Sequence, residues 1–142
     1  MCLEQRERNG YKNDKKELAL EYHKKGYNCT QAVACAFCGE FGVSEEEMYK
    51  IAEGFGLGMG MMDICGALTG LFMLIGMKNS GGVEQAGKTK ADTYKKTREY
   101  AAKFKEINGS VYCKELKGVE TGKSLHHVIN VSWMLWSSQS SS

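Results

Sequence analysis

The sequence predicts an all-α protein, a small single-domain bundle of about five helices around a buried, glycine-rich central helix. Three observations predict this fold. The 142 residues include no proline and 17 glycines, which suits helices that end at glycine. Apolar residues recur at helical spacing, and no stretch shows the alternation of a strand. Residues 54–78 carry almost no charge, as expected for a helix buried on all sides.

Capping residues and glycine stops place the helices in order along the chain. Asn28 is a predicted N-cap, and Ser44 forms an S-x-x-E capping box with Glu47. Gly26 and Gly42 are expected to end the helices that precede these caps. The expected helices span residues 13–25, 28–41, 44–52, 63–78 and 83–108, and a short one follows at residues 110–117.

The central helix is expected to begin at Asp63, which resembles an N-cap and would put Cys65 in the first turn. Exposed N–H groups and the helix dipole stabilise an anion there, so a thiol loses its proton more easily. Gly66 and Gly70 form a G-x-x-x-G pair on one face of this helix. Small residues at that spacing allow another helix to pack closely against the backbone.

Composition limits the classes of function. A net charge of +2 without a basic stripe argues against a nucleic-acid partner. The charged N-terminal residues do not resemble a signal peptide, so a cytoplasmic location is expected. A membrane span within residues 61–77 is a minority alternative, because Asp63 interrupts a stretch shorter than the roughly 20 residues that a bilayer needs. In a reducing compartment, the six cysteines favour redox activity or metal binding over structural disulfides.

Three cysteines share one predicted position, the first turn of a helix. Cys29 follows Asn28, Cys65 follows Asp63, and Cys113 follows Ser110. Each one alone is more simply a small buried apolar residue, but the three together predict a common site. The C-x-x-C of Cys35 and Cys38 lies deep in a helix, away from its N-terminal turn, so these two are interpreted as buried substitutes for alanine.

Other candidate residues have a structural explanation beside the functional one. The glycine positions Gly56, Gly58, Gly60 and Gly66 could bind an anion or a cofactor against the helix start, and a structural turn explains them equally well. Met59, Met61, Met62, Met73 and Met77 are interpreted as adaptable core filling rather than as soft-metal ligands. Cys2 is interpreted as incidental, and His126 and His127 as solvated.

Three pieces of the chain, GYNCTQAV, EGFGLGMGMMDICGALTG and NGSVYCKELKG, resemble the C_GCAxxG_C_C family of redox-active proteins. The resemblance covers residues 18–118, and the CGAxxG core corresponds to residues 65–70. It implies a largely helical, cytoplasmic protein with four functional cysteines, three of which match Cys29, Cys65 and Cys113. The fourth would lie beyond Gly118, where this chain has no cysteine. The family's name implies redox activity without a settled substrate.

Three functions follow as hypotheses. The first is a thiol-based redox protein in which Cys65 is the most acidic thiol and forms a disulfide or binds a redox centre together with Cys29 or Cys113. Such a protein would exchange electrons with a redox partner that the sequence does not identify. The second is a module that binds a metal ion or an iron–sulfur cluster through Cys29, Cys65 and Cys113 without turnover of its own. The third is a structural helical subunit that assembles through the Gly66/Gly70 face, for which a homo-oligomer is one form.

Residues 1–120 are expected to form the helical domain, and residues 121–142 a divergent, frame-shifted and poorly ordered tail. If each codon's third base is read with the first two of the next, His127-Val128 and Asn130-Val131 each encode Cys or Arg. Trp133-Met134 must then encode Asp. The shifted frame can therefore supply the missing cysteine in a C-x-x-C, which arginine codons at both positions would exclude.

Overall fold

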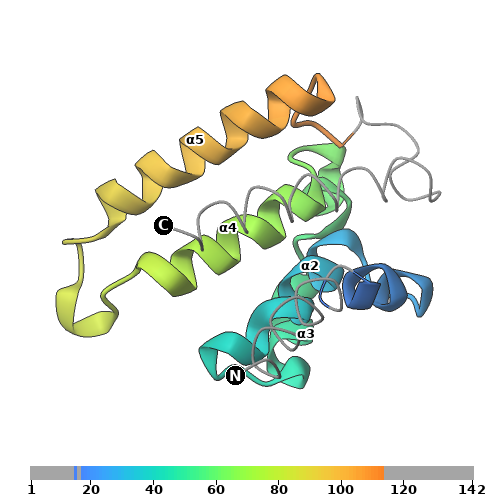
Figure 1. Ribbon diagram of the computed structural model, residues 1–142, viewed down its shortest axis with the longest axis horizontal. Coiled ribbons are helices and arrows are strands. Elements are labelled where there is room, and N and C mark those ends of the chain that lie inside the picture. The colour runs from blue at the N-terminus through green and yellow to red at the C-terminus, as the bar shows by residue number, and fades with distance from the viewer. Residues whose placement is uncertain (1–14, 16, 114–142) are drawn as a thin grey trace, which may run out of the picture.

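The computed structural model describes residue 15 and residues 17–113, and this part of the chain is all-α, as predicted (Figure 1). It contains no strand within those residues, only one isolated bridge between two extended segments. A helical segment covers residues 15 and 17–24. The elements that follow are α2 (Cys29–Phe37), a 3₁₀ turn (Cys38–Phe41), α3 (Glu45–Glu53), an irregular π-type turn (Gly58–Met62), α4 (Gly66–Asn79), a second 3₁₀ turn (Val83–Gln85) and α5 (Lys90–Asn108).

Helix α4 lies at the centre of the arrangement, as the sequence predicts (Figure 1). α2 packs against one side of it, and α3 packs against α2. α5 runs back along α4 in the opposite direction after the loop at residues 80–89. The start of α4 therefore lies near the end of α5 and near α2, which is where the candidate site is found.

Two groups of buried side chains form the hydrophobic core. The larger group joins α2, α4 and α5, and the smaller one joins α2 to α3. Leu68, Leu74 and Phe104 are completely buried in the larger group. Burial of such side chains contributes roughly 1.5–3 kcal/mol each, so the contact between α4 and its two neighbours stabilises the fold.

The predicted N-caps of α2 and α3 are confirmed. The Asn28 side chain accepts a hydrogen bond from the Gln31 N–H, and the Gln31 side chain accepts one from the Asn28 N–H, both at 2.9 Å. The Ser44 hydroxyl accepts from the Glu47 N–H at 3.1 Å. The first N–H groups of a helix have no hydrogen-bond acceptor within the helix, and each cap supplies an acceptor for one of them.

Away from the candidate site, two helix boundaries differ from the predictions. The α-helical part of the second helix ends at Phe37 and tightens to a 3₁₀ turn before Gly42. The long charged helix begins at Lys90 instead of Val83, because residues 83–85 form a separate turn and Gly87 has a φ of +82°. A left-handed residue ends any helix that reaches it, so the apolar and charged pattern of the segment was not sufficient to place its start.

The face of Gly66 and Gly70 packs inside the protein. A Cβ atom on Gly70 would lie 3.0 Å from the Thr30 carbonyl oxygen and 3.0 Å from Val33 Cβ, both on α2. The close helix contact predicted from the G-x-x-x-G spacing is therefore present, but α2 of the same chain makes it. The hypothesis of a subunit that assembles through this face is wrong, because the face is already covered.

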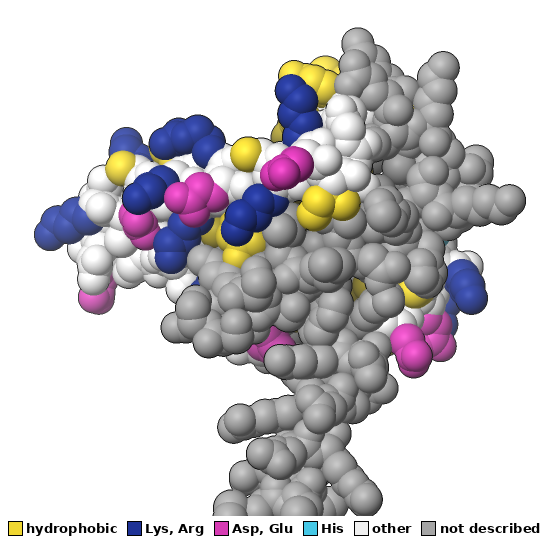
Figure 2. Space-filling model, turned by 45° about the horizontal axis from the view of Figure 1, so that its top comes forward, with side chains coloured by type: hydrophobic (Ala, Val, Ile, Leu, Met, Phe, Trp, Pro, Cys, Tyr) yellow, Lys and Arg dark blue, Asp and Glu magenta, His cyan; other side chains and the backbone are white. Residues whose placement is uncertain are grey.

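Helix α5 is amphipathic, with Tyr100 and Phe104 turned toward α4 and Tyr94 exposed. Figure 2 shows basic and acidic side chains interspersed over α5 rather than a single basic stripe. The Lys103 ammonium lies 6.0 Å from the centre of the Tyr100 ring, where a cation is attracted to the aromatic face. Within residues 15 and 17–113, no helix combines the length and the apolar character that crossing a membrane requires.

Candidate functional site

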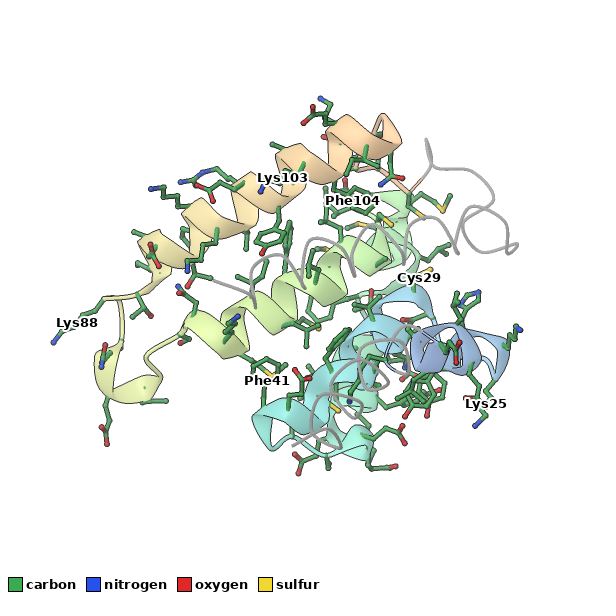
Figure 3. The ribbon with its side chains drawn as sticks, viewed as in Figure 1. Lys25, Cys29, Phe41, Lys88, Lys103 and Phe104 are labelled. Atoms are coloured by element: carbon green, nitrogen blue, oxygen red, sulfur yellow. The ribbon has the colours of Figure 1, made fainter. Side chains whose placement is uncertain are left out.

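Cys29 is the first residue of α2, as predicted, and its side chain is 1% exposed. The capping interactions of Asn28 fix the position of this turn. Cys29 faces the start of α4, because a Cβ atom on Gly66 would lie 3.1 Å from Cys29 Cβ (Figure 3). Cys29 is thus held beside the residue that follows Cys65.

Cys65 is the N-cap of α4, and it does not lie in the first turn behind Asp63 as predicted. The prediction fails because Asp63 belongs to an extended segment that pairs with residues far along the chain. The Asp63 carbonyl accepts a hydrogen bond from the Cys113 N–H at 2.6 Å, and the Cys65 N–H donates to the Val111 carbonyl at 2.7 Å. Cys65 is 1% exposed and still lies next to the N–H groups that begin α4.

Cys113 is buried, but the segment that contains it is not the predicted helical turn. Residues 110–113 are extended and turn-like, and Tyr112 forms an antiparallel bridge with Ile64. The Ser110 hydroxyl accepts from the Tyr112 N–H at 3.0 Å, so it stabilises a local turn instead of capping a helix. The hypothesis that all three cysteines share a first-turn position is therefore correct only for Cys29.

All three cysteines nevertheless lie on segments that adjoin the start of α4. In an antiparallel pair, side chains alternate between the two faces. Cys65 and Cys113 follow Ile64 and Tyr112 on their respective strands, so they lie diagonally across from each other on the opposite face. Cys29 approaches from α2 through its contact with the Gly66 backbone.

Thr30 links three segments around the site, and the sequence prediction missed it. Its hydroxyl lies 2.9 Å from the Gly66 carbonyl and 3.1 Å from the Phe55 carbonyl, and the side chain is fully buried. A buried hydroxyl with carbonyl acceptors from two other segments fixes their spacing. A polar residue among the mostly apolar residues of α2 was the available clue.

The glycine-rich loop, defined here as residues 54–64, has a backbone that the residue types alone do not predict. Leu57, Met59 and Met62 have positive φ angles, which residues with a side chain rarely adopt. At Gly56 a Cβ atom would overlap the Asn28 side chain, and at Gly58 it would overlap the Asp63 backbone. At these two glycines, as at Gly66, atoms of the protein itself fill the space that a side chain would need. The role of Gly56, Gly58, Gly60 and Gly66 in binding a cofactor stays a prediction.

The methionines of this loop are not core filling. Met59, Met61 and Met62 are exposed, with Met61 at 71%. Met73 and Met77 do pack against the core groups, so the interpretation is confirmed for those two. The Met62 sulfur lies 3.9 Å from the Cys113 sulfur, a contact between residues so far apart in sequence that no local pattern indicated it.

Cys35 and Cys38 lie in a different environment, between α2 and α3. Burial, followed by the neighbouring Cys38 and Glu45, raises the pKa of the Cys35 thiol to about 12. Burial also raises the pKa of Cys38. The nearby Tyr22 has a raised pKa because it is partly buried and donates a hydrogen bond to Glu45. Thiols that keep their protons are poor nucleophiles, which agrees with the sequence interpretation of this C-x-x-C as inert core residues.

The three-cysteine metal site finds no support in this geometry. Among the residues that the structure describes, no three His, Cys, Asp or Glu side chains come together in an arrangement that could hold a metal ion. Structural zinc and iron–sulfur sites normally use four such ligands. Cys2, His126, His127 and the whole predicted tail lie outside the described residues.

The family comparison covers most of the chain. A family model described as "Putative redox-active protein (C_GCAxxG_C_C)" matches residues 27–130, which extends past Gly118, where the resemblance seen in the sequence ends. No curated protein and no solved structure matches this chain. The matched region includes Cys29, Cys65 and Cys113, whose segments adjoin the start of α4. The chain therefore belongs to the C_GCAxxG_C_C family, whose description gives its members a redox role.

Proposed function

We propose that the protein is a thiol-based redox protein in which Cys65 is the central thiol. The observation that carries this proposal is that the segments bearing Cys29, Cys65 and Cys113 adjoin one another at the start of α4. The segment of Cys65 adjoins those of the other two cysteines. It pairs with the one that carries Cys113, and Cys29 packs against Gly66, the residue that follows Cys65. Cys65 is also the N-cap residue of α4, next to the first N–H groups of the helix.

Cys113 is the disulfide partner that the bridge between Ile64 and Tyr112 favours. Diagonal neighbours in such a pair are separated by roughly 7 Å, whereas the Cβ atoms of a disulfide are about 3.5–4.5 Å apart. Residues 110–113 must therefore shift for the bond to close. Two backbone hydrogen bonds, with Asp63 and Cys65, hold that segment beside the start of α4, and the segment is not part of a helix. Cys29 is the alternative partner.

The reaction is a thiol–disulfide exchange with a low-molecular-weight disulfide as the oxidant. The Cys65 thiolate attacks one sulfur of that disulfide, forms a mixed disulfide and releases one thiolate. The Cys113 thiolate then attacks the Cys65 sulfur and releases the second thiolate. The two protons of Cys65 and Cys113 pass to the two released thiolates, so one disulfide is reduced for each disulfide formed.

Oxidised glutathione is a suitable probe for the full-length protein. After oxidation, the remaining thiols are alkylated, and the disulfide-linked peptides are identified by mass spectrometry. We expect a peptide pair that contains Cys65 and Cys113, and we expect Cys65→Ser to abolish it. Cys35→Ser and Cys38→Ser are matched controls, because they remove buried thiols from the other side of α2. A disulfide between Cys35 and Cys38, with Cys65 still reduced, would contradict the proposal.

A further inference from the structure

The exposed methionines of the glycine-rich loop have no role in the disulfide chemistry proposed above. Met59, Met61 and Met62 are 40%, 71% and 39% exposed, although a thioether side chain is apolar and gains by burial. They occupy three of four consecutive positions, so several methionine side chains reach the surface within one short loop. A function that uses the sulfur atoms themselves would account for this placement.

The geometry of the Met62 and Cys113 sulfurs suits shared coordination. Their separation is 3.9 Å. Two sulfur ligands that bind one d¹⁰ ion at roughly 2.3 Å, with an angle of about 120° between the bonds, lie about 4 Å apart. An ion could therefore join these two sulfurs without separating the segments that carry them. The Cys113 N–H hydrogen bond to the Asp63 carbonyl, at 2.6 Å, holds Cys113 beside the loop that carries Met62.

The donor atoms determine which ion the pair prefers. Thiolate and thioether sulfur are soft ligands that select copper(I), whereas zinc sites use cysteine, histidine and carboxylate ligands. Among residues 15 and 17–113, no three side chains of His, Cys, Asp or Glu come together as a metal site. The arrangement thus offers a thiolate and a thioether without a third ligand of the kind that zinc requires.

We propose that Met62 and Cys113 form a copper(I) site, with a thioether of Met59 or Met61 as the third ligand. Binding replaces the Cys113 proton by the ion, so each copper(I) bound releases one proton and changes no oxidation state. The neighbouring methionines lie on the same loop and are exposed enough to turn toward the ion. The site needs a reduced Cys113 but does not depend on a disulfide between Cys113 and Cys65.

The test is a competition for copper(I) between the full-length reduced protein and bicinchoninate under anaerobic conditions, followed by the absorbance of the copper–bicinchoninate complex. The wild-type protein should withdraw copper from the indicator. Met62→Leu should weaken the affinity by at least about tenfold, because the loss of even a supporting group around a metal typically costs 10- to 100-fold. Met73→Leu, which replaces a partly buried methionine of α4, is the matched control and should bind like the wild type.

Silver(I), which shares the preference of copper(I) for sulfur, gives a second measurement that requires no variant. Addition of silver(I) should shift the Met62 methyl resonance in the NMR spectrum and leave that of Met73 in place. Equal copper(I) affinity of the wild type and Met62→Leu would overturn the proposal, and so would a wild-type protein that takes no copper from bicinchoninate. Because Met62→Leu retains every thiol, its disulfide formation with oxidised glutathione separately reports whether the redox proposal holds.

Discussion

The cysteines of α2 show how strongly position within one helix changes the chemistry of the same residue type. Cys29 lies in the first turn and contacts the start of α4, whereas Cys35 lies two turns later and faces Glu45 and the tyrosines. The Tyr22 and Tyr27 rings stack at 4.5 Å, and Tyr49 meets Tyr27 edge-on at 4.8 Å. This aromatic group covers the side of α2 away from the candidate site.

The buried Cys35 thiol should make the stability of the protein depend on alkaline pH. Burial raises its pKa from 9.0 to about 12, so the unfolded chain loses this proton at a lower pH than the folded chain does. The stabilising contribution is therefore complete below about pH 9 and declines between pH 9 and pH 12, by about 1.4 kcal/mol per pH unit. Urea unfolding at several pH values should show a shallower decline for Cys35→Ala than for the wild type.

A control for this pH dependence comes from the same group of side chains. Met48→Leu changes a neighbouring side chain in the core group of α2 and α3 without removing a group that titrates. Its unfolding free energy should decline above pH 9 as steeply as that of the wild type. An equal decline for Cys35→Ala would show that this thiol is ionised in the folded protein.

The site residues differ in how far their positions follow from the sequence. Cys29 was predicted correctly, because Asn28 and Gln31 form a cap that depends only on adjacent residues. The N-cap of α4 was placed at Asp63 in error, because the partner of this residue, Cys113, lies fifty positions away. The contact of Met62 with Cys113 was missed for the same reason, and the left-handed conformations of Leu57 and Met59 have no marker in those residue types.

At the scale of helices, α2 and α4 approach each other closely at Gly66 and Gly70. This contact places Cys29 and Cys65 on the two sides of one interface. The sequence predicted it from the spacing of two small residues, which is a property of the helix itself. The sequence could not identify which helix packs there, because any helix in the protein could in principle pack against the Gly66 and Gly70 pair.

Gly70→Ala should destabilise the protein by about 1–3 kcal/mol, because the new Cβ overpacks the interface. It would lie 3.0 Å from the Thr30 carbonyl oxygen, a backbone atom that cannot move without displacing α2. Gly76→Ala in the same helix is the control, since a Cβ there meets no atom within 4 Å. That change should stabilise the helix by roughly 0.5–1 kcal/mol. Urea unfolding of both variants gives the comparison, and equal effects would contradict the interface.

Asn28→Ala should cost more than the roughly 1 kcal/mol of an ordinary N-cap. The Asn28 side chain accepts from the Gln31 N–H and also donates to the Glu53 carbonyl at 3.0 Å, so it joins the start of α2 to the end of α3. Ser44→Ala removes a simple cap and serves as the reference. Thermal unfolding should show a larger drop in Tm for Asn28→Ala, and a smaller one would mean that the link to Glu53 contributes nothing.

At the scale of the whole molecule, the helix order follows from the sequence, but the pairing at the site does not. The number and type of the helices come from local caps and apolar spacing, and the structure confirms the all-α class. The isolated bridge between Ile64 and Tyr112 is one residue pair long, so it leaves no alternating pattern to recognise. That bridge is what brings Cys113 to Cys65.

We propose that residues 1–120 form the folding unit, since the two core groups and the buried Cys113 all lie within residues 19–113. A chain that ends at residue 120 should keep the far-UV helix signal and the Tm of the full-length protein. A chain that ends at residue 108 is the control, because it lacks the bridge segment and Cys113, and its Tm should fall. If both truncations lower the Tm equally, the residues beyond 120 belong to the folding unit.

The short bridge between Ile64 and Tyr112 also links folding to reduction potential. A disulfide from Cys65 to Cys113 would enclose a loop of roughly 50 residues, and the lost chain entropy of the unfolded state would stabilise the fold by about 4 kcal/mol. By the same thermodynamic cycle, folding would lower the potential of this disulfide by about 90 mV relative to the unfolded chain. A reductant of intermediate strength would then cleave the bond only in molecules whose loop has opened.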